Sequence, residues 1–294
     1  MQLSLPALLT LLCIALAPAP LRAQQPDPHA RQTAADFANA YQAWQQAHDA
    51  DEKIKLGERV LALEPTVASW PLAVSRSLLK AQVSGALGNL YVSRPGGVRA
   101  DNLEKAIGYL QVALGERTRA ADPVDWAAIH NDLGVAYWGR IRGARADNQE
   151  TAIAHLEAAQ TVFTREAYPD RWGQLQNNLA IVYWSRIRGE ADTNVEEAIA
   201  RFEAALSIFT RERDPNGWAA TQNNLANAYT RRVRGDQADN REMAIKHLEA
   251  ALSSFRAMGI LSSGRRPRTI WRLPIRVACA GDAAEKPGNG HRRF

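Results

Sequence analysis

Three asparagines recur at equal intervals and carry polar groups from which a binding surface could be built. Asn131, Asn177 and Asn223 are each 46 residues apart, and each is followed by a second amide or carboxyl residue. An asparagine side chain offers two N–H donors and one carbonyl acceptor, which suits it to hold an extended peptide backbone without reading the peptide's side chains. The alternative is that these amides form hydrogen bonds across neighbouring helices and set their spacing. The sequence leaves both interpretations open.

Further residues share a helix face with each asparagine, because positions three, four and seven apart lie on one side of an α-helix. Tryptophan on such a face adds flat apolar area. Arginine near a helix C-terminus either complements the helix dipole or binds an anion. The tryptophans have a competing explanation, which is packing against the next helix. The complete candidate peptide-binding surface consists of Asn131, Val135, Trp138, Arg142, Asn177, Ile181, Trp184, Arg188, Asn223, Asn227, Thr230 and Arg234.

Residue patterns typical of catalysis are absent from the sequence. It contains no Gly-x-Ser-x-Gly nucleophile turn, no phosphate-binding glycine loop and no His-Glu-x-x-His zinc motif. His155 and His247 occupy equivalent positions but lie two periods apart, so we expect solvated helix residues and no metal site. We therefore predict a protein that is not an enzyme, has no cofactor, and binds a protein or an extended peptide. The sequence does not define the oligomeric state.

Two helices are expected to position this surface in each 46-residue period. Apolar residues recur at helical spacing twice between residues 172 and 209. Gly189, between the two stretches, is expected to adopt the left-handed conformation that ends the first helix. Thr193 with Glu196 is expected to open the second helix as a capping box, in which the two side chains satisfy free backbone N–H groups. The period is visible in Tyr91, Tyr137, Tyr183 and Tyr229, and in Trp126, Trp172 and Trp218.

The motif in each period resembles the tetratricopeptide repeat. The first helix carries the Leu-Gly-x-x-Tyr run that ends at Tyr137, and the second carries Ala152, Leu156 and Ala159. The usual period of that family is about 34 residues, so we assign the extra residues to the turns. The resemblance implies an all-α, right-handed solenoid of tandem helix-turn-helix repeats, similar to bacterial multi-repeat scaffolds. In such proteins the first helices line the concave face, and some members hold peptides there with an asparagine ladder.

The chain is expected to divide into four parts. Residues 1–23 contain a short apolar run followed by prolines and a small residue, as in a secretory signal peptide, and the run is too short for a membrane-spanning helix. Residues 24–66 are predicted to form a polar leader and two capping helices, and residues 67–258 four repeats. Residues 259–294 are predicted to form a basic tail. We therefore expect export to the periplasm or beyond.

The positive charge of the chain belongs to its end. The whole chain has a net charge of +5, whereas residues 264–294 hold eight Lys and Arg against two Asp and Glu, so the residues before them sum to −1. The 46-residue period also stops after Met258. Three explanations remain open: a solvated tail; a change of coding frame, which would make the chain the recognition part of a larger enzyme or signalling protein; or a tail that targets an anionic membrane or nucleic acid. A specific nucleic-acid site is not expected, because the charge lies outside the folded repeats.

Overall fold

The computed structural model describes residues 28–67 and 70–259, and within these ranges the chain forms ten α-helices and one short 3-10 helix. The first three elements are α2 (Pro28–Gln46), α3 (Ala50–Leu63) and η1 (Glu64–Thr66). Four hairpins follow: α4 (Arg76–Ser93) with α5 (Arg99–Gly115), α6 (Pro123–Gly139) with α7 (Arg145–Gln160), α8 (Pro169–Trp184) with α9 (Ala191–Leu206), and α10 (Pro215–Arg231) with α11 (Gln237–Ala257). The predicted all-α solenoid is confirmed. The predicted signal peptide and nearly all of the predicted basic tail lie outside the described residues.

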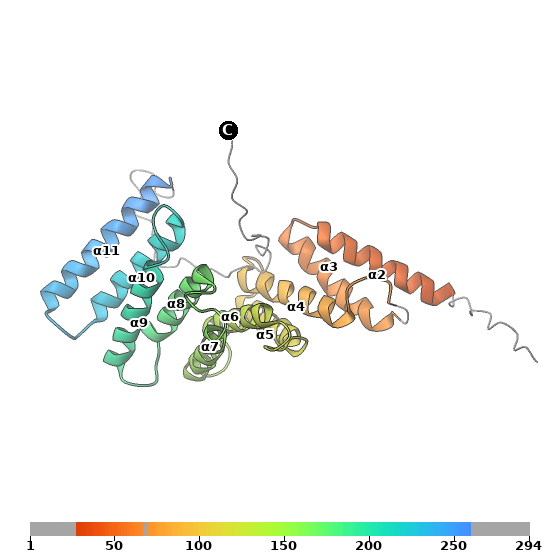
Figure 1. Cartoon of the computed structure of the whole chain (residues 1–294), viewed down its shortest axis with the longest axis horizontal. Helices are drawn as coiled ribbons and strands as arrows, with labels where there is room; N and C mark the ends of the chain where they lie inside the picture. Colours follow the sequence, from red (N-terminus) through yellow and green to blue (C-terminus); the bar gives the residue numbers. More distant parts are fainter. Residues whose placement is uncertain (1–27, 68–69, 260–294) are drawn as a thin grey trace, which may run out of the picture.

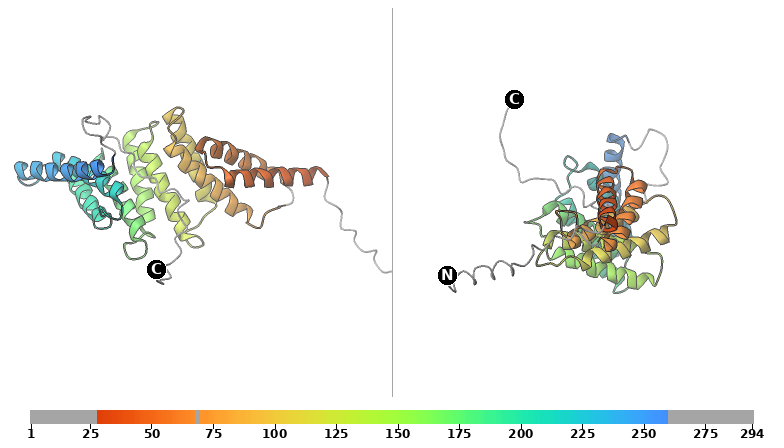
Figure 2. Two further views of the ribbon diagram at one scale, coloured as in Figure 1. Left: turned by 90° about the horizontal axis from the view of Figure 1, so that it is seen from above. Right: turned by 90° about the vertical axis from the view of Figure 1, so that its right-hand side faces the viewer.

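The hairpins stack in chain order into an elongated row, which Figure 2 shows from above and end-on. The row is bent, and α4, α6, α8 and α10 lie along its inner, concave side while α5, α7 and α9 lie along the outer side (Figure 1). The first helices of the repeats thus form one inner face, as the resemblance implied. Among the described helices, none combines the length and hydrophobicity that crossing a membrane requires.

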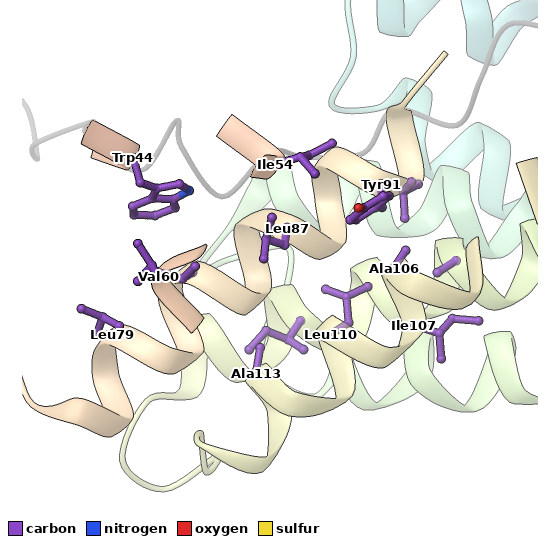
Figure 3. Close-up of a cluster of buried hydrophobic side chains, with 14 of the residues drawn as sticks. Trp44, Ile54, Val60, Leu79, Leu87, Tyr91, Ala106, Ile107, Leu110 and Ala113 are labelled. Carbon is purple, nitrogen blue, oxygen red and sulfur yellow. The ribbon is translucent and has the colours of Figure 1, made fainter. Parts of the chain in front are cut away.

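The core repeats with the period of the sequence. In the first hairpin Leu87 and Leu110 are fully buried (Figure 3), and Leu133 and Leu156, one period later, are fully buried as well. The glycine of the Leu-Gly-x-x-Tyr run makes room for the leucine of the second helix, because a Cβ atom on Gly134 would lie 2.5 Å from Leu156 Cγ. Small residues at this position therefore let the two helices of a hairpin approach closely.

A buried asparagine that was not predicted fixes the turn inside each hairpin. Asn194 donates a hydrogen bond of 2.8 Å from its side chain to the carbonyl oxygen of Arg188. Gly189 beside it has a φ of +79°, so the predicted left-handed glycine is confirmed, although it lies within the turn and α8 already ends at Trp184. The same side-chain bond to the residue six positions earlier is made by Asn102, Asn148, Asn194 and Asn240.

The predicted capping box at Thr193 and Glu196 is wrong. α9 begins at Ala191, so Thr193 lies within its first turn, and the N-cap residue Glu190 makes no side-chain cap. Glu196 instead accepts two hydrogen bonds, of 2.7 and 2.9 Å, from the guanidinium of Arg232 in the next hairpin. A bidentate arginine–carboxylate pair is stronger than a neutral cap, so the carboxylate joins two hairpins. Equivalent pairs are Arg140 with Glu104 and Arg186 with Glu150.

Substitution of Asn194 and of its neighbour Thr193 tests these two assignments. We expect Asn194→Ala to lower the free energy of unfolding by about 1–3 kcal/mol, because a buried amide and the bond that fixes the turn are lost. Thr193 is exposed, and Thr193→Ala should change it by no more than about 0.5 kcal/mol. Urea denaturation followed by circular dichroism measures both. A larger loss of unfolding free energy for Thr193→Ala than for Asn194→Ala would support the capping box and contradict both assignments.

Candidate peptide-binding surface

The predicted asparagines lie where the inner helices meet. Asn131 of α6 accepts a hydrogen bond of 3.0 Å from the Nδ2 of Asn178 in α8, and it donates one of 3.2 Å to the carboxyl group of Asp132. Asn177 of α8 accepts a bond of 3.2 Å from the hydroxyl of Thr221 in α10. We call these five residues the polar seam. It joins three inner helices to one another, so these hydrogen-bonding groups are used within the fold.

Three of the predicted surface residues are not available to a ligand. Asn131 and Asn223 are 6% and 4% exposed, and Val135 is 5% exposed within the core cluster that α4 and α6 share. The close approach of neighbouring inner helices covers these positions. For Asn131 the structure shows the alternative interpretation, a hydrogen bond across neighbouring helices.

The two predicted tryptophans are half-buried beneath arginines. Trp138 donates its indole N–H to the hydroxyl of Ser185 at 3.2 Å, and the Arg145 guanidinium lies 5.5 Å from the centre of the Trp138 ring. The Arg231 guanidinium lies 5.2 Å from the Trp184 ring and donates to the Trp184 carbonyl oxygen at 3.0 Å. Such cation–π contacts hold the rings in place. Both tryptophans thus pack against residues beyond their own helix.

The other predicted residues reach the surface where α8 and α10 run side by side. Asn177, Ile181 and Asn227 are half-buried, and Thr230 is exposed at the end of α10. The predicted residues that remain partly exposed on the inner face thus lie mainly on α8 and α10.

The predicted arginines differ in their partners. Arg142 forms an ion pair with Asp101, and Arg188 forms one with Asp147. The residue equivalent to these two acids in the third hairpin is Thr193, and among the described residues Arg234 has no acidic partner. Arg234 is therefore an exposed cation that the fold leaves uncompensated.

Asp132 is a buried acid in the polar seam. Burial raises the pKa of its carboxyl group to about 7, although hydrogen bonds from Asn89 and Asn131 lower it. The equivalent positions of the next two hairpins are Asn178 and Asn224, whose amides cannot ionise. The carboxyl group is the one member of this series whose charge can change.

The expectation of solvated histidines is wrong. The Nδ1 atoms of His155 and His130 are 3.0 Å apart, and the His155 ring stacks on Tyr137 with ring centres 5.6 Å apart. Burial lowers the pKa of His130 to about 4, with a further contribution from His155, and burial also lowers the pKa of His155. His247 stacks on Tyr229 in the same way. The repeat position of His155 and His247 thus places a flat side chain over the tyrosine of the first helix. In the third hairpin that side chain is the guanidinium of Arg201, which lies over Tyr183.

These rings are a packing feature of the hairpins, and nothing in their surroundings completes a metal site. Within residues 28–67 and 70–259 there is no group of three His, Cys, Asp or Glu side chains that could hold a metal ion.

The stacked hairpins and their shared inner face define a helical-repeat protein. Comparison with protein-family models gives no match, and comparison with curated proteins gives none either. Among solved structures the chain is similar to BtubC (BKLC) from P. vanneervenii, with a TM-score of 0.52 and 19% sequence identity over 82% of this chain and 96% of that chain. At this identity the similarity supports the helical-repeat fold and carries no information about function.

Asp132→Asn should make the protein more stable at neutral and alkaline pH. The folded-state pKa of about 7 lies above the ordinary value of 3.8, so the folded chain holds a proton that the unfolded chain releases. The contribution of Asp132 to stability is therefore most favourable below pH 3.8 and becomes less favourable as the pH rises to 7, by about 4 kcal/mol at most. We expect a higher Tm for the variant at pH 8 and a smaller difference at pH 5. The exposed Asp192→Asn is the control, and an equal effect of both variants would contradict the assignment.

The histidine pair should act in the opposite direction. The lowered pKa values mean that the folded protein resists protonation, so stability is full above pH 6.5 and falls as the pH drops toward 4. In the third hairpin the equivalent residues are Gln176 and Arg201, and Arg201 donates a hydrogen bond of 3.1 Å to the Gln176 side chain. In an Asp132→Asn background we expect His130→Gln with His155→Arg, which imitates this pair, to reduce the loss of Tm between pH 7.5 and pH 5. If the variant loses as much Tm as the background protein, groups other than His130 and His155 cause the acid sensitivity.

Proposed function

We propose that the protein is a non-catalytic scaffold that binds an extended peptide or a protein segment on the inner face of its helix row. The site is the C-terminal half of that face, formed by α8 and α10. Ile181 and Trp184 supply apolar area there, and Asn227 and Thr230 supply an amide and a hydroxyl group. These groups suit a peptide whose backbone needs hydrogen bonds and whose side chains include an apolar residue.

The observation that carries the proposal is the uncompensated charge of Arg234. In the two preceding hairpins the equivalent arginine is paired with an aspartate, and here Thr193 stands in place of that aspartate. An exposed guanidinium favours a carboxylate ligand, with which it forms bidentate hydrogen bonds. Arg234 lies in the turn after α10, so we expect an acidic residue in the part of the bound peptide that reaches this turn.

The repeats themselves support a long-period relative of the tetratricopeptide fold. The Leu-Gly-x-x-Tyr run has a physical role in the first two hairpins, since its glycine admits Leu110 or Leu156 against the first helix, and the later copies have the small residues Ala180 and Ala226 there. Repeats of this kind serve many partners, so the fold alone does not select one. The signal-like sequence at residues 1–23 supports export, which would place the partner in the periplasm or outside the cell.

The test begins with selection of peptides from a displayed random library on the immobilised protein. We expect the selected peptides to contain acidic and apolar residues, and their affinity is measured by fluorescence anisotropy. Thr193→Asp would give Arg234 the partner that Arg142 and Arg188 have, and it should weaken binding about five- to tenfold, or about 1–1.4 kcal/mol. Arg234→Ala should weaken binding to a similar degree, and neither change should lower the Tm by more than a few degrees.

Val112→Ala is the matched control, because Val112 is an exposed residue on the outer helix α5. Its affinity should equal that of the wild type. Peptides without acidic residues, or an affinity that Thr193→Asp leaves unchanged, would overturn the assignment of Arg234.

A further inference from the structure

The last helix exposes a residue that every earlier repeat buries. Ile107, Ile153 and Ile199 are 5%, 6% and 5% exposed, because the next hairpin covers each of them. Ile245 of α11 occupies the same repeat position and is 56% exposed. Leu248, equivalent to the buried Phe202, is likewise only half-buried. The outward face of α11 is thus an apolar surface with no cover among the described residues.

Polar residues on this face also lack the partners that their counterparts have. Glu196 and its equivalents bind an arginine of the next hairpin, whereas Glu242 has no basic partner within residues 28–67 and 70–259. Glu203, equivalent to Glu249, accepts a hydrogen bond of 3.2 Å from the next tyrosine, Tyr229. Glu242 and Glu249 therefore both point toward whatever covers α11.

One substitution argues against another repeat as that cover. The position of Val195 is buried beneath the following hairpin and is otherwise held by Leu103 and Gln149. In α11 this position is Arg241, which is exposed. A further hairpin of the same kind would bury the Arg241 guanidinium at a position that Leu103 and Val195 fill with apolar side chains and Gln149 with a hydrogen-bonded amide, and a buried charge without an acidic partner is strongly destabilising.

The face is instead complementary to itself. Arg241 lies four residues before Ile245 and Glu249 lies four residues after it, so the three share one side of the helix. If two α11 helices pack antiparallel about a two-fold axis at Ile245, each Arg241 meets the Glu249 of the other helix. In a two-fold contact the same patch serves both subunits, and each pair then occurs twice.

We propose that two copies of this chain associate through α11, packed antiparallel with Ile245 on the axis. Leu248 and Leu252 flank the axis, and two Arg241–Glu249 ion pairs close the contact. An interface of one helix from each subunit lies at the small end of those that form stable dimers, so we expect dissociation in the micromolar range, about 1–50 μM. The contact is independent of peptide binding on the inner face.

Sedimentation velocity of the full chain between 1 and 100 μM tests the association. The wild type should shift from monomer to dimer over this range, and Ile245→Arg should remain monomeric throughout. Ile187→Arg is the control, because Ile187 is similarly exposed, at 60%, but lies in the turn after α8. A wild type that is monomeric at 100 μM, or a dimer that Ile245→Arg leaves intact, would overturn the proposal.

Charge exchange tests the antiparallel geometry. Arg241→Glu should weaken the dimer at least tenfold, and adding Glu249→Arg should restore it, because the exchanged pair has the same attraction. With Cys13→Ser and Cys279→Ser, Ile245→Cys should form a disulfide-linked dimer under mild oxidation, because a residue on the axis meets its own copy. Failure of the double exchange to restore association rules out this arrangement. A dimer that is lost when residues 260–294 are removed would assign the contact to that segment.

Discussion

A helical hairpin of this chain cannot bury its own apolar residues, and this constraint governs the rest of the structure. Each second helix has one side against its own first helix and the other side against the next hairpin. The isoleucine series shows how large the effect is, since the same residue is 5% exposed where a neighbour follows and 56% exposed where none does in the described chain. The bidentate pair between Arg232 and Glu196 lies at the same junction and fixes the orientation of one hairpin on the next. The stability of the fold therefore depends on the contacts between neighbouring hairpins. Whether a residue of a second helix is buried depends on whether another hairpin packs against it.

The same close stacking explains why part of the expected binding surface is internal. Neighbouring inner helices approach until side chains such as Asn131 and Asn178 meet, and a buried amide is stable only if its hydrogen bonds are made. The polar seam meets that requirement with groups that a peptide would otherwise use. Asp132 shows the limit of this arrangement, because its carboxyl group accepts hydrogen bonds within the seam and still has its pKa raised by burial. Among the described residues of the predicted surface, Thr230 at the end of α10 and Arg234 in the following turn are exposed, and Arg234 has no acidic partner.

The fold could be predicted from the sequence because the period, the apolar spacing and the turn glycines all require the same arrangement. Gly189 has the predicted left-handed conformation for that reason. The prediction of a capping box was wrong because Thr193 and Glu196 fit a local sequence motif, whereas the Glu196 carboxylate is bound by Arg232, 36 residues away. His155 was misjudged because its partners, His130 and Tyr137, lie on the facing helix. The Asn194 turn, by contrast, is predictable from the sequence, because an asparagine recurs at this position every 46 residues.

Positions where the copies differ carry more information about function than positions where they agree. Residues that recur unchanged, such as Asn194 or the tyrosine of each first helix, are explained by the hairpin that they hold together. Thr193 and Arg241 depart from the pattern at charged or buried positions, and neither departure improves the packing of its own hairpin. Thr193 leaves the Arg234 cation without an acidic partner, and Arg241 places a cation at a position that the earlier copies fill with Leu103, Gln149 and Val195. Departures of this kind are costly or neutral for folding, and the two proposals give each of them a physical reason: a peptide carboxylate for Arg234, and a second copy of the chain for Arg241.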